Sequence, residues 1–256
     1  MYKLKLFTLI LFLGCSATKI SFVEELQQKF NKGEQLYEDG KYTRAKDEFK
    51  FVVMNNPGSK MALDAQYLLG ESHFKLKEYL EAAVEFDRFA RFSQSDDRTE
   101  LARFRICECA INMSNSFQKD QTNTLEAIER LQEFIEDYPI SSNIELATEE
   151  ISSLRLKLAK KDFESARLYL KLEEYDSALI YLNNVLAEYY DTNIIDEGRI
   201  TIVFVYLLQN KSEMATSYLE NQEHNFISKL KFEEGRVLIN DMKNGLSMSE
   251  YIRLYK

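Results

Sequence analysis

The chain has 256 residues, with two prolines, eight glycines and a formal net charge of −9 at pH 7. So few helix breakers, together with many Leu, Glu, Lys and Ala residues, favour an all-α fold. The net negative charge argues against nucleic acid as the main partner, since phosphate binding needs a basic stripe. It does not exclude a local basic patch that binds a protein partner.

The first fourteen residues have the features of a secretory signal peptide. Lys3 and Lys5 precede an apolar run from Leu6 to Leu13, which is too short to span a bilayer as a helix. The alternative is an apolar start on a cytosolic protein. That interpretation is the less favourable one, because it leaves these eight residues in water.

Cys15 follows directly, and the run Phe12-Leu13-Gly14-Cys15 resembles the bacterial lipobox, in which the cysteine becomes the lipid-modified first residue of the mature protein. Phe12 departs from the lipobox, where Leu is usual. Acyl chains contribute about 0.8 kcal/mol per buried CH₂, so two or more hold a protein firmly on a membrane. Ser16 stands where an Asp signals inner-membrane retention in enterobacterial lipoproteins, so the resemblance implies the outer membrane. We expect residues 15–24 to form a lipidated tether at its periplasmic face.

A motif then occurs twice with a period of 37 residues, which is typical of stacked repeat arrays. The matching pairs are Gly33 and Gly70, Tyr42 and Tyr79, Ala45 and Ala82, and Phe49 and Phe86. The glycine precedes the alanine by 12 residues, which leaves room for a helix, a short turn and a second helix. The small residues let two antiparallel helices approach closely, and the aromatic one turn after the alanine fills the gap. Pro57 ends the second helix, and the whole pattern resembles the tetratricopeptide repeat.

The third repeat keeps its first helix over residues 100–117 but carries an insertion. Its alanine, Ala127, comes about eight positions later than the period requires, so we expect a polar inter-helix loop of that extra length. We expect Thr122 or Thr124 to cap the following helix, and Pro139 to end it.

Cys107 takes the small-residue position of the third repeat, and Cys109 lies two residues further along the same predicted helix. Their side chains then point in nearly opposite directions, so they should not form a disulfide with each other. With no second pair and no nearby histidine they make a poor metal site. We expect two packed or half-packed thiols, no metal and no cofactor.

The pattern over residues 141–172 predicts one long helix that joins two halves of the array and ends as the first helix of the fourth repeat. A fifth, degenerate pair covers residues 194–220, and a helix over 226–242 caps the open end of the stack. Residues 247–256 form a short helix or fray.

Together these elements predict an all-α tetratricopeptide-repeat solenoid of about five helical hairpins plus a C-terminal helix. The N-terminal half, residues 25–138, holds three hairpins, and the C-terminal half, residues 139–256, holds the long connecting helix and the cap.

Several short motifs besides the lipobox carry a resemblance to one family: Asn56 to Ser59 (Asn-Pro-Gly-Ser), Asp120-Gln121-Thr122 before Ala127-Ile128, Phe134-Ile135, Tyr138-Pro139-x-Ser141, the run from Leu154 to Ala159, and Tyr175-x-x-Ala178. Their order is similar to that of the BamD family, lipoproteins of the outer-membrane β-barrel assembly machinery, over roughly Lys29 to Thr192. Departures are Tyr190, where a proline is usual, and the segment from Ile194 onward, which does not align.

The resemblance implies a periplasmic scaffold tethered to the outer membrane, with no catalysis. Its C-terminal half would dock the POTRA domains of a BamA-like barrel protein, and its N-terminal half would receive unfolded outer-membrane protein precursors. Other assembly lipoproteins are further partners that the resemblance allows.

In a tetratricopeptide array the first helix of each pair lines the concave groove. Counted from Gly33 and Gly70, the groove positions hold Phe30, Glu34 and Tyr37 in repeat one and Tyr67, Glu71 and Phe74 in repeat two. Aromatics beside acidic residues suit an extended peptide with an aromatic end, since aromatic rings give a large contact area for little entropy loss. The alternative, equally consistent with the spacing, is that these rings only pack between repeats.

For partner docking the sequence indicates a neighbourhood around Arg167, Glu174, Asp196 and Arg199. Two other functions stay open. The chain could be another envelope scaffold with the same repeats, in cell division, peptidoglycan or pilus assembly, which would differ in the proteins that co-purify with it. An enzyme would need a nucleophile and base, a phosphate loop or a metal spacing, and the sequence shows none.

Overall fold

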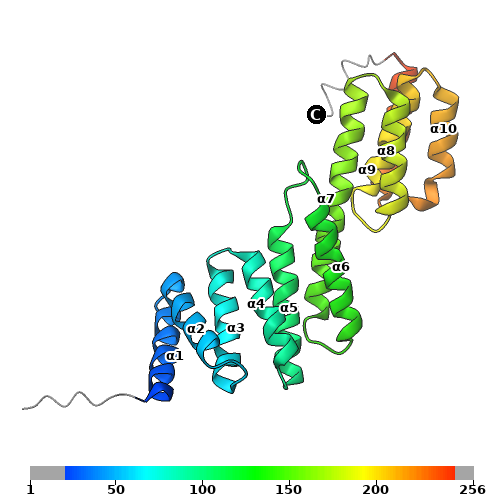
Figure 1. Cartoon of the computed structure of the whole chain (residues 1–256). Helices are drawn as coiled ribbons and strands as arrows, with labels where there is room; N and C mark the ends of the chain where they lie inside the picture. Colours follow the sequence, from blue (N-terminus) through cyan, green and yellow to red (C-terminus); the bar gives the residue numbers. More distant parts are fainter. Residues whose placement is uncertain (1–20, 246–256) are drawn as a thin grey trace, which may run out of the picture.

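The computed structural model describes residues 21–245, which form eleven α-helices and one 3₁₀ turn, with no strand in that range (Figure 1). The helices are α1 (Phe22–Glu38), α2 (Tyr42–Asn55), α3 (Lys60–Lys75), α4 (Tyr79–Phe92), α5 (Asp96–Met113), α6 (Thr122–Asp137), α7 (Ile144–Lys171), α8 (Tyr175–Glu188), α9 (Ile195–Leu208), α10 (Ser212–Asn221) and α11 (Lys229–Lys243), with η1 (Glu223–Asn225) before the last. The signal peptide, Cys15 and the segment 247–256 lie outside the described residues. Among the described helices, none is long and apolar enough to cross a membrane.

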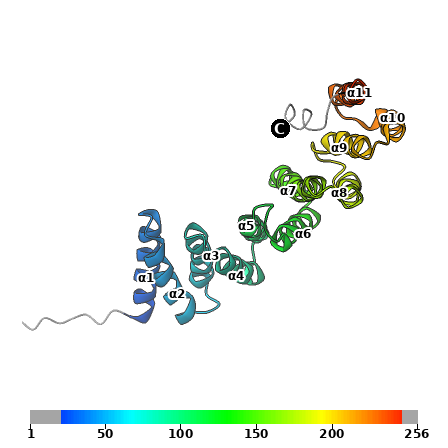
Figure 2. The same cartoon turned by 90° about the horizontal axis from the view of Figure 1, so that it is seen from above.

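Consecutive helices pair into five hairpins, α1–α2, α3–α4, α5–α6, α7–α8 and α9–α10, and α11 packs on α9 and α10. Seen from above, the first helix of each pair lies along the concave side of a curved array and the second along the convex side (Figure 2). This confirms the predicted all-α tetratricopeptide-repeat solenoid closed by a C-terminal helix.

A glycine that faces an aromatic ring sets the spacing of the first two hairpins. A Cβ added to Gly33 would lie 2.7 Å from the ring of Phe49, and one on Gly70 would lie 2.8 Å from Phe86. Both rings are fully buried. The glycines therefore let each ring lie against the backbone of the first helix, as the repeat pattern predicts.

The later hairpins fill the same space with different side chains. Where the first two have glycine and Phe, hairpins three to five have larger residues on the first helix and leucine on the second: Cys107 with Leu131, Ala166 with Leu182, and Val203 with Leu219. All six side chains are buried. A larger residue on the first helix is thus matched by a smaller one on the second, which lets each hairpin stay closely packed.

The turns inside the hairpins share one backbone conformation. Gly40, Lys77, Glu173 and Asn210 have φ angles of 73°, 62°, 61° and 58°, and each precedes the alanine of its hairpin by the same number of residues. Glycine adopts this left-handed conformation freely, whereas a residue with a Cβ pays about 1–2 kcal/mol. In the third hairpin the insertion replaces this turn.

The insertion, residues 114–121, is packed against α7. Lys157 Nζ donates a hydrogen bond to Ser114 Oγ at 2.7 Å, and Lys161 Nζ donates to the carbonyl of Lys119 at 2.8 Å. Burial lowers the pKa of Lys157. These hydrogen bonds therefore hold the loop against the long helix.

The start of α6 differs from the expectation. The helix begins at Thr122 after Gln121 and has no side-chain cap on its N-cap residue. The N–H of Thr122 donates to the carboxylate of Asp120, and the hydroxyl of the buried Thr124 donates to Gln121 Oε1 at 2.8 Å. Neither threonine is the cap, because Asp120 already accepts the first free N–H group and Thr122 is itself helical.

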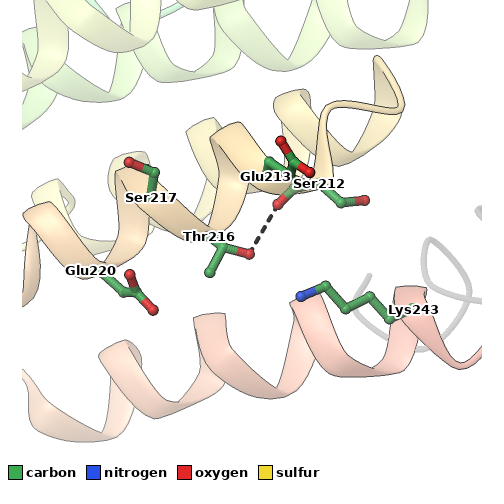
Figure 3. Close-up of a pocket in the computed structure, with 6 residues that line it drawn as sticks. All are labelled: Ser212, Glu213, Thr216, Ser217, Glu220 and Lys243. Carbon is green, nitrogen blue, oxygen red and sulfur yellow. Dashed lines mark hydrogen bonds between the residues drawn. The ribbon is translucent and has the colours of Figure 1, made fainter.

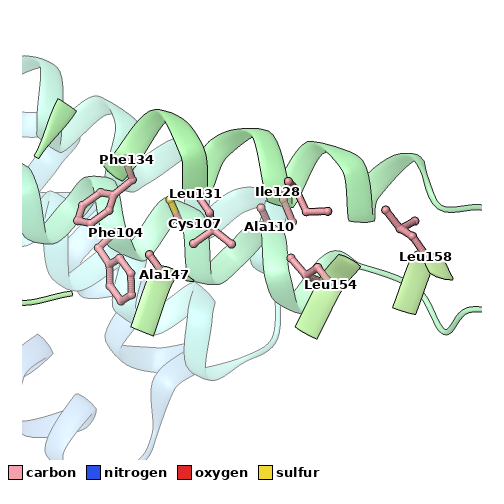
Figure 4. Close-up of a cluster of buried hydrophobic side chains, with 10 residues drawn as sticks. Phe104, Cys107, Ala110, Ile128, Leu131, Phe134, Ala147, Leu154 and Leu158 are labelled. Carbon is pink, nitrogen blue, oxygen red and sulfur yellow. The ribbon is translucent and has the colours of Figure 1, made fainter. Parts of the chain in front are cut away.

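Helix α7 is the predicted long connection, and its two ends belong to different cores. Its first half contributes Ala147, Leu154 and Leu158 to a buried cluster shared with α5 and α6 (Figure 4). Its second half contributes Phe163 and Ala166 to a cluster shared with α8 and α9. The cores of the two halves therefore meet inside α7, after Leu158.

Two smaller predictions concern the N-terminal tether and the cysteines. Helix α1 begins at Phe22 behind a capping box of Ser21 and Glu24, so the last residues of the expected tether are helical. Cys107 and Cys109 are buried free thiols, as predicted. Burial raises the pKa of each to about 12, which keeps both protonated at neutral pH.

Candidate peptide groove and docking surface

The predicted groove residues lie on α1 and α3, on the concave side of the array (Figure 2). Phe30 packs against Phe49 with ring centroids 6.0 Å apart, and Tyr67 packs against Phe86 and Phe89 at 5.4 and 5.3 Å. Phe30 and Tyr67 are nevertheless only half-buried. One part of each ring belongs to the core, and the rest remains open to solvent.

The other two predicted aromatics follow the glycines by one turn. Tyr37 packs edge-on against Tyr42, and Phe74 packs edge-on against Tyr79, with centroids 5.3 and 5.4 Å apart. Both are half-buried. The tyrosine at the start of each second helix therefore supports a ring on the first helix and fixes its direction.

A charged network joins α1, α3 and α5 across this face. Arg105 Nε donates to one carboxylate oxygen of Glu71 at 2.6 Å and a terminal nitrogen donates to the other oxygen, while Nη1 binds Glu108 at 2.7 Å. The guanidinium lies 4.2 Å from the ring centroid of Phe74. From α1, the hydroxyl of Tyr37 donates to Glu71 at 3.5 Å. Because Glu71 is only 8% exposed and already paired, it is not a free acidic group of the groove.

The network shifts the pKa of several of its members. Burial, with the nearby carboxylate of Glu71, raises the pKa of Tyr37 to about 12 and that of Tyr67 well above its usual value. Burial alone would lower the pKa of Arg105, but hydrogen bonds to Glu71 and Glu108 outweigh it and raise the pKa. At neutral pH the tyrosines are therefore neutral donors and Arg105 is a permanent cation.

Glu34 is the exposed acidic residue of the predicted groove. Partial burial, and then repulsion from Glu38 and Asp64, raise its pKa. Asp64 is paired with Arg98 at 2.7 Å. A cationic group of a ligand at Glu34 would relieve this repulsion, so this position can contribute to binding where Glu71 cannot.

The four predicted docking residues do not form one surface. Arg167 and Glu174 are exposed at the α7–α8 turn, and Arg167 pairs with Glu164 at 2.8 Å. Asp196 and Arg199 lie near the start of α9, beyond the other end of α8, and are only 4% and 8% exposed. Asp196 and Arg199 are packed inside the chain, so of this neighbourhood only Arg167 and Glu174 present their side chains to solvent.

The buried pair organises the loop before α11. Arg199 Nη1 donates to Asp196 Oδ1 at 2.9 Å, and the same carboxylate accepts the backbone N–H groups of Ile227 and Ser228 at 3.1 and 2.8 Å. In this loop Ile227 is 70% exposed, and Leu230, in the first turn of α11 directly after it, is 79% exposed. The sequence analysis did not identify these two residues. They are apolar but fall outside the buried positions of the repeat pattern, and this is the signal that could have identified them.

A shallow hollow lies between α10 and α11 (Figure 3). It is lined by residues with polar or charged side chains, Ser212, Glu213, Thr216, Ser217, Glu220 and Lys243. A small-molecule site is usually an apolar cavity with a few placed polar groups, which this open hollow does not resemble. Within residues 21–245 no group of His, Cys, Asp or Glu is arranged to hold a metal.

The profile of a family described as YfiO, outer membrane lipoprotein, matches residues 24–220. The chain belongs to the YfiO family. The match runs from the first turn of α1 to the last turn of α10, so it includes all five hairpins of this chain and excludes α11.

One relative of this YfiO-family chain is the outer membrane protein assembly factor BamD of Caulobacter vibrioides, which is 25% identical over 141 residues. That alignment covers 53% of this chain and 45% of the relative, so the chain spans less than half of the relative's length.

Among solved structures, a fragment of MamA from Desulfovibrio magneticus is 11% identical with a TM-score of 0.36, over 79% of this chain and 95% of that one. A thermophilic tetratricopeptide-repeat protein of Thermus thermophilus is 18% identical with a TM-score of 0.34, over 86% and 99%. A tetratricopeptide-repeat protein of Parabacteroides merdae is 13% identical with a TM-score of 0.38, over 86% and 88%.

Proposed function

We propose that this YfiO-family protein is a scaffold of a β-barrel assembly machinery, held at the periplasmic face of the outer membrane by lipids on Cys15. The family match over all five hairpins carries the proposal. The relative named as an outer-membrane protein assembly factor supports it. A curved stack of hairpins presents a long concave face of the kind that repeat proteins use to bind other proteins.

The N-terminal half receives unfolded barrel precursors on its concave side. The strands of membrane barrels alternate apolar and polar side chains and carry aromatic girdles, so an unfolded segment exposes aromatic rings at regular spacing. The open parts of Phe30, Tyr37, Tyr67 and Phe74 can stack with such rings. Glu34 supplies the accessible negative charge.

The C-terminal half docks the folded POTRA domain of a BamA-like barrel protein. Ile227 and Leu230 are large and exposed, and the backbone N–H of Ile227 is held by Asp196. Exposed apolar side chains that lie this close together mark a site where a protein partner can bind. In this proposal Asp196 and Arg199 act indirectly, by shaping the loop. Arg167 and Glu174 lie at the far end of α8 and form a separate, polar contact.

Photocrosslinking in the native envelope tests both surfaces. A photoreactive residue at Glu34 should capture assorted unfolded barrel proteins, and one at Leu230 should capture a single large barrel protein with periplasmic domains. Asp47 on α2 and Glu213 on α10 are exposed control positions on second helices and should capture neither. If Glu34 and Leu230 find no barrel protein, the chain is the scaffold of another envelope system, such as cell division, peptidoglycan or pilus assembly.

A further inference from the structure

Exposed apolar side chains gather at one edge of the N-terminal half. Because the hairpins are antiparallel, the starts of α1, α3, α5 and α7 meet the ends of α2, α4 and α6 along one line, at the bottom of Figure 1. The large exposed apolar residues on this loop edge are Phe22, Val23, Met54, Phe92, Ile140 and Leu146.

The opposite edge, formed by the turns inside the hairpins, is less apolar. In the described part of the first three hairpins, Leu80 and Leu125 are the large exposed apolar residues in the first turns of second helices, and no aromatic ring is among them. On the loop edge Ile140 is 97% exposed and Phe92 is 69% exposed. A concentration of this kind along one edge marks a contact surface.

We propose that the loop edge of the N-terminal half rests on the lipid surface to which the chain is anchored. The inference rests on the lipidation of Cys15 in the proposed function. Five residues lie between Cys15 and Ser21, the N-cap of α1, so even a fully extended chain spans at most about 22 Å from one to the other. The lipidated Cys15 of the proposed function thus keeps the start of α1, with Phe22 and Val23, close to the membrane surface.

The charges on this edge define the kind of lipid. The first turns of α1, α5 and α7 carry the acidic residues Glu24, Glu25, Asp96, Asp97 and Glu145. They outnumber the basic residues of the same edge, which are Lys60, Arg91 and Arg98, and the last two of these are paired with Asp87 and Asp64. Carboxylates are repelled by anionic headgroups, which instead attract basic segments. The contact is therefore made by insertion of apolar side chains between neutral headgroups, as in interfacial helices whose Phe and Leu residues enter the headgroup region.

The absence of tryptophan from the chain allows a direct test, because a single introduced tryptophan is then the only indole reporter. The lipidated full-length protein is placed on phosphatidylcholine vesicles that contain brominated acyl chains. We expect the emission of Phe92→Trp to shift to the blue and to be quenched by the bromine. Leu80→Trp is the matched control, since it is 64% exposed at the opposite end of the same helix, about 18 Å away at 1.5 Å per residue.

Ile140→Trp repeats the measurement at a loop residue that is almost fully exposed, where a tryptophan should not disturb folding. The test therefore still gives a result if Phe92→Trp fails to fold. Equal emission from the loop-edge and Leu80→Trp variants, on vesicles with which the protein floats, would overturn the inference while leaving the anchor intact. Stronger quenching on phosphatidylglycerol vesicles would overturn the apolar character of the contact. If the full-length protein carries no lipid and does not float with vesicles, both the lipid anchor and this inference are wrong. The partner surfaces of the proposed function are tested separately, by crosslinking.

Discussion

Replacement of Gly33 by alanine should destabilise the first hairpin, although alanine is the better helix former. The added Cβ would lie 2.7, 2.9 and 3.1 Å from three atoms of the Phe49 ring, and this ring is fully buried. Overpacking of this kind costs about 1–3 kcal/mol, whereas Gly→Ala in a helix interior recovers about 1 kcal/mol. We expect a net loss of up to about 2 kcal/mol.

A substitution of Phe49, the ring that faces Gly33, measures how strongly the two positions depend on each other. Phe49→Leu alone should cost about 1–2 kcal/mol, because it leaves a cavity beside the glycine. The double variant recreates the Ala166 and Leu182 pair of the fourth hairpin. Its two changes should therefore compensate each other, with a favourable coupling energy of about 1–2 kcal/mol.

Hydrogen exchange of the α1 and α2 amides, together with urea unfolding, measures these effects, because stability in a repeat array is local. Gly198→Ala is the matched control. Gly198 is also a buried helical glycine, but its Cβ would meet nothing closer than 3.4 Å, so alanine there should stabilise by up to about 1 kcal/mol. Equal effects of the two glycine substitutions, or additive costs in the double variant, would refute the packing account.

Further predictions concern the turns, the charged network and acid stability. Lys77→Gly should stabilise the chain by about 0.5–1 kcal/mol, and Gly40→Ala should destabilise it by a similar amount, because both residues have positive φ; urea midpoints check both. Glu71→Gln should cost about 2–3 kcal/mol, since it removes the bidentate one of the two carboxylates that pair with the largely buried Arg105, and an unchanged melting temperature would contradict this. Asp191 accepts hydrogen bonds from an arginine that hold its pKa below the ordinary 3.8, so it stabilises the fold above that pH and loses this effect as the pH falls through the lower native value. The unfolding midpoints of the wild type and Asp191→Asn should therefore differ at about pH 6 and converge below about pH 3.

The hairpin architecture could be predicted because a period reports local packing. Gly33 and Phe49 recur with fixed spacing, and their contact is the one that the pattern implies. The long helix α7 was also predictable, since its segment lacks Gly and Pro and keeps a helical apolar period. Its role as the meeting place of two cores was not, because that depends on how the neighbouring hairpins stack.

The candidate sites were predicted less well, because no periodic pattern encodes which polar groups pair across repeats. Glu71 looks like an open groove residue until Arg105, 34 positions later, binds it. Asp196 looks like a surface carboxylate until the backbone N–H groups of Ile227 and Ser228 are found on it. Such contacts arise from the curvature of the whole stack.

The central claim, that this YfiO-family chain serves β-barrel assembly, is tested most directly by depletion of the protein from its native bacterium. The measured quantity is the amount of folded outer-membrane barrel, separated from unfolded precursor by its heat-modifiable mobility in a gel. The account predicts that folded barrels fall and unfolded precursors accumulate, while other outer-membrane lipoproteins keep their levels. Undiminished folded barrels after complete depletion would contradict it.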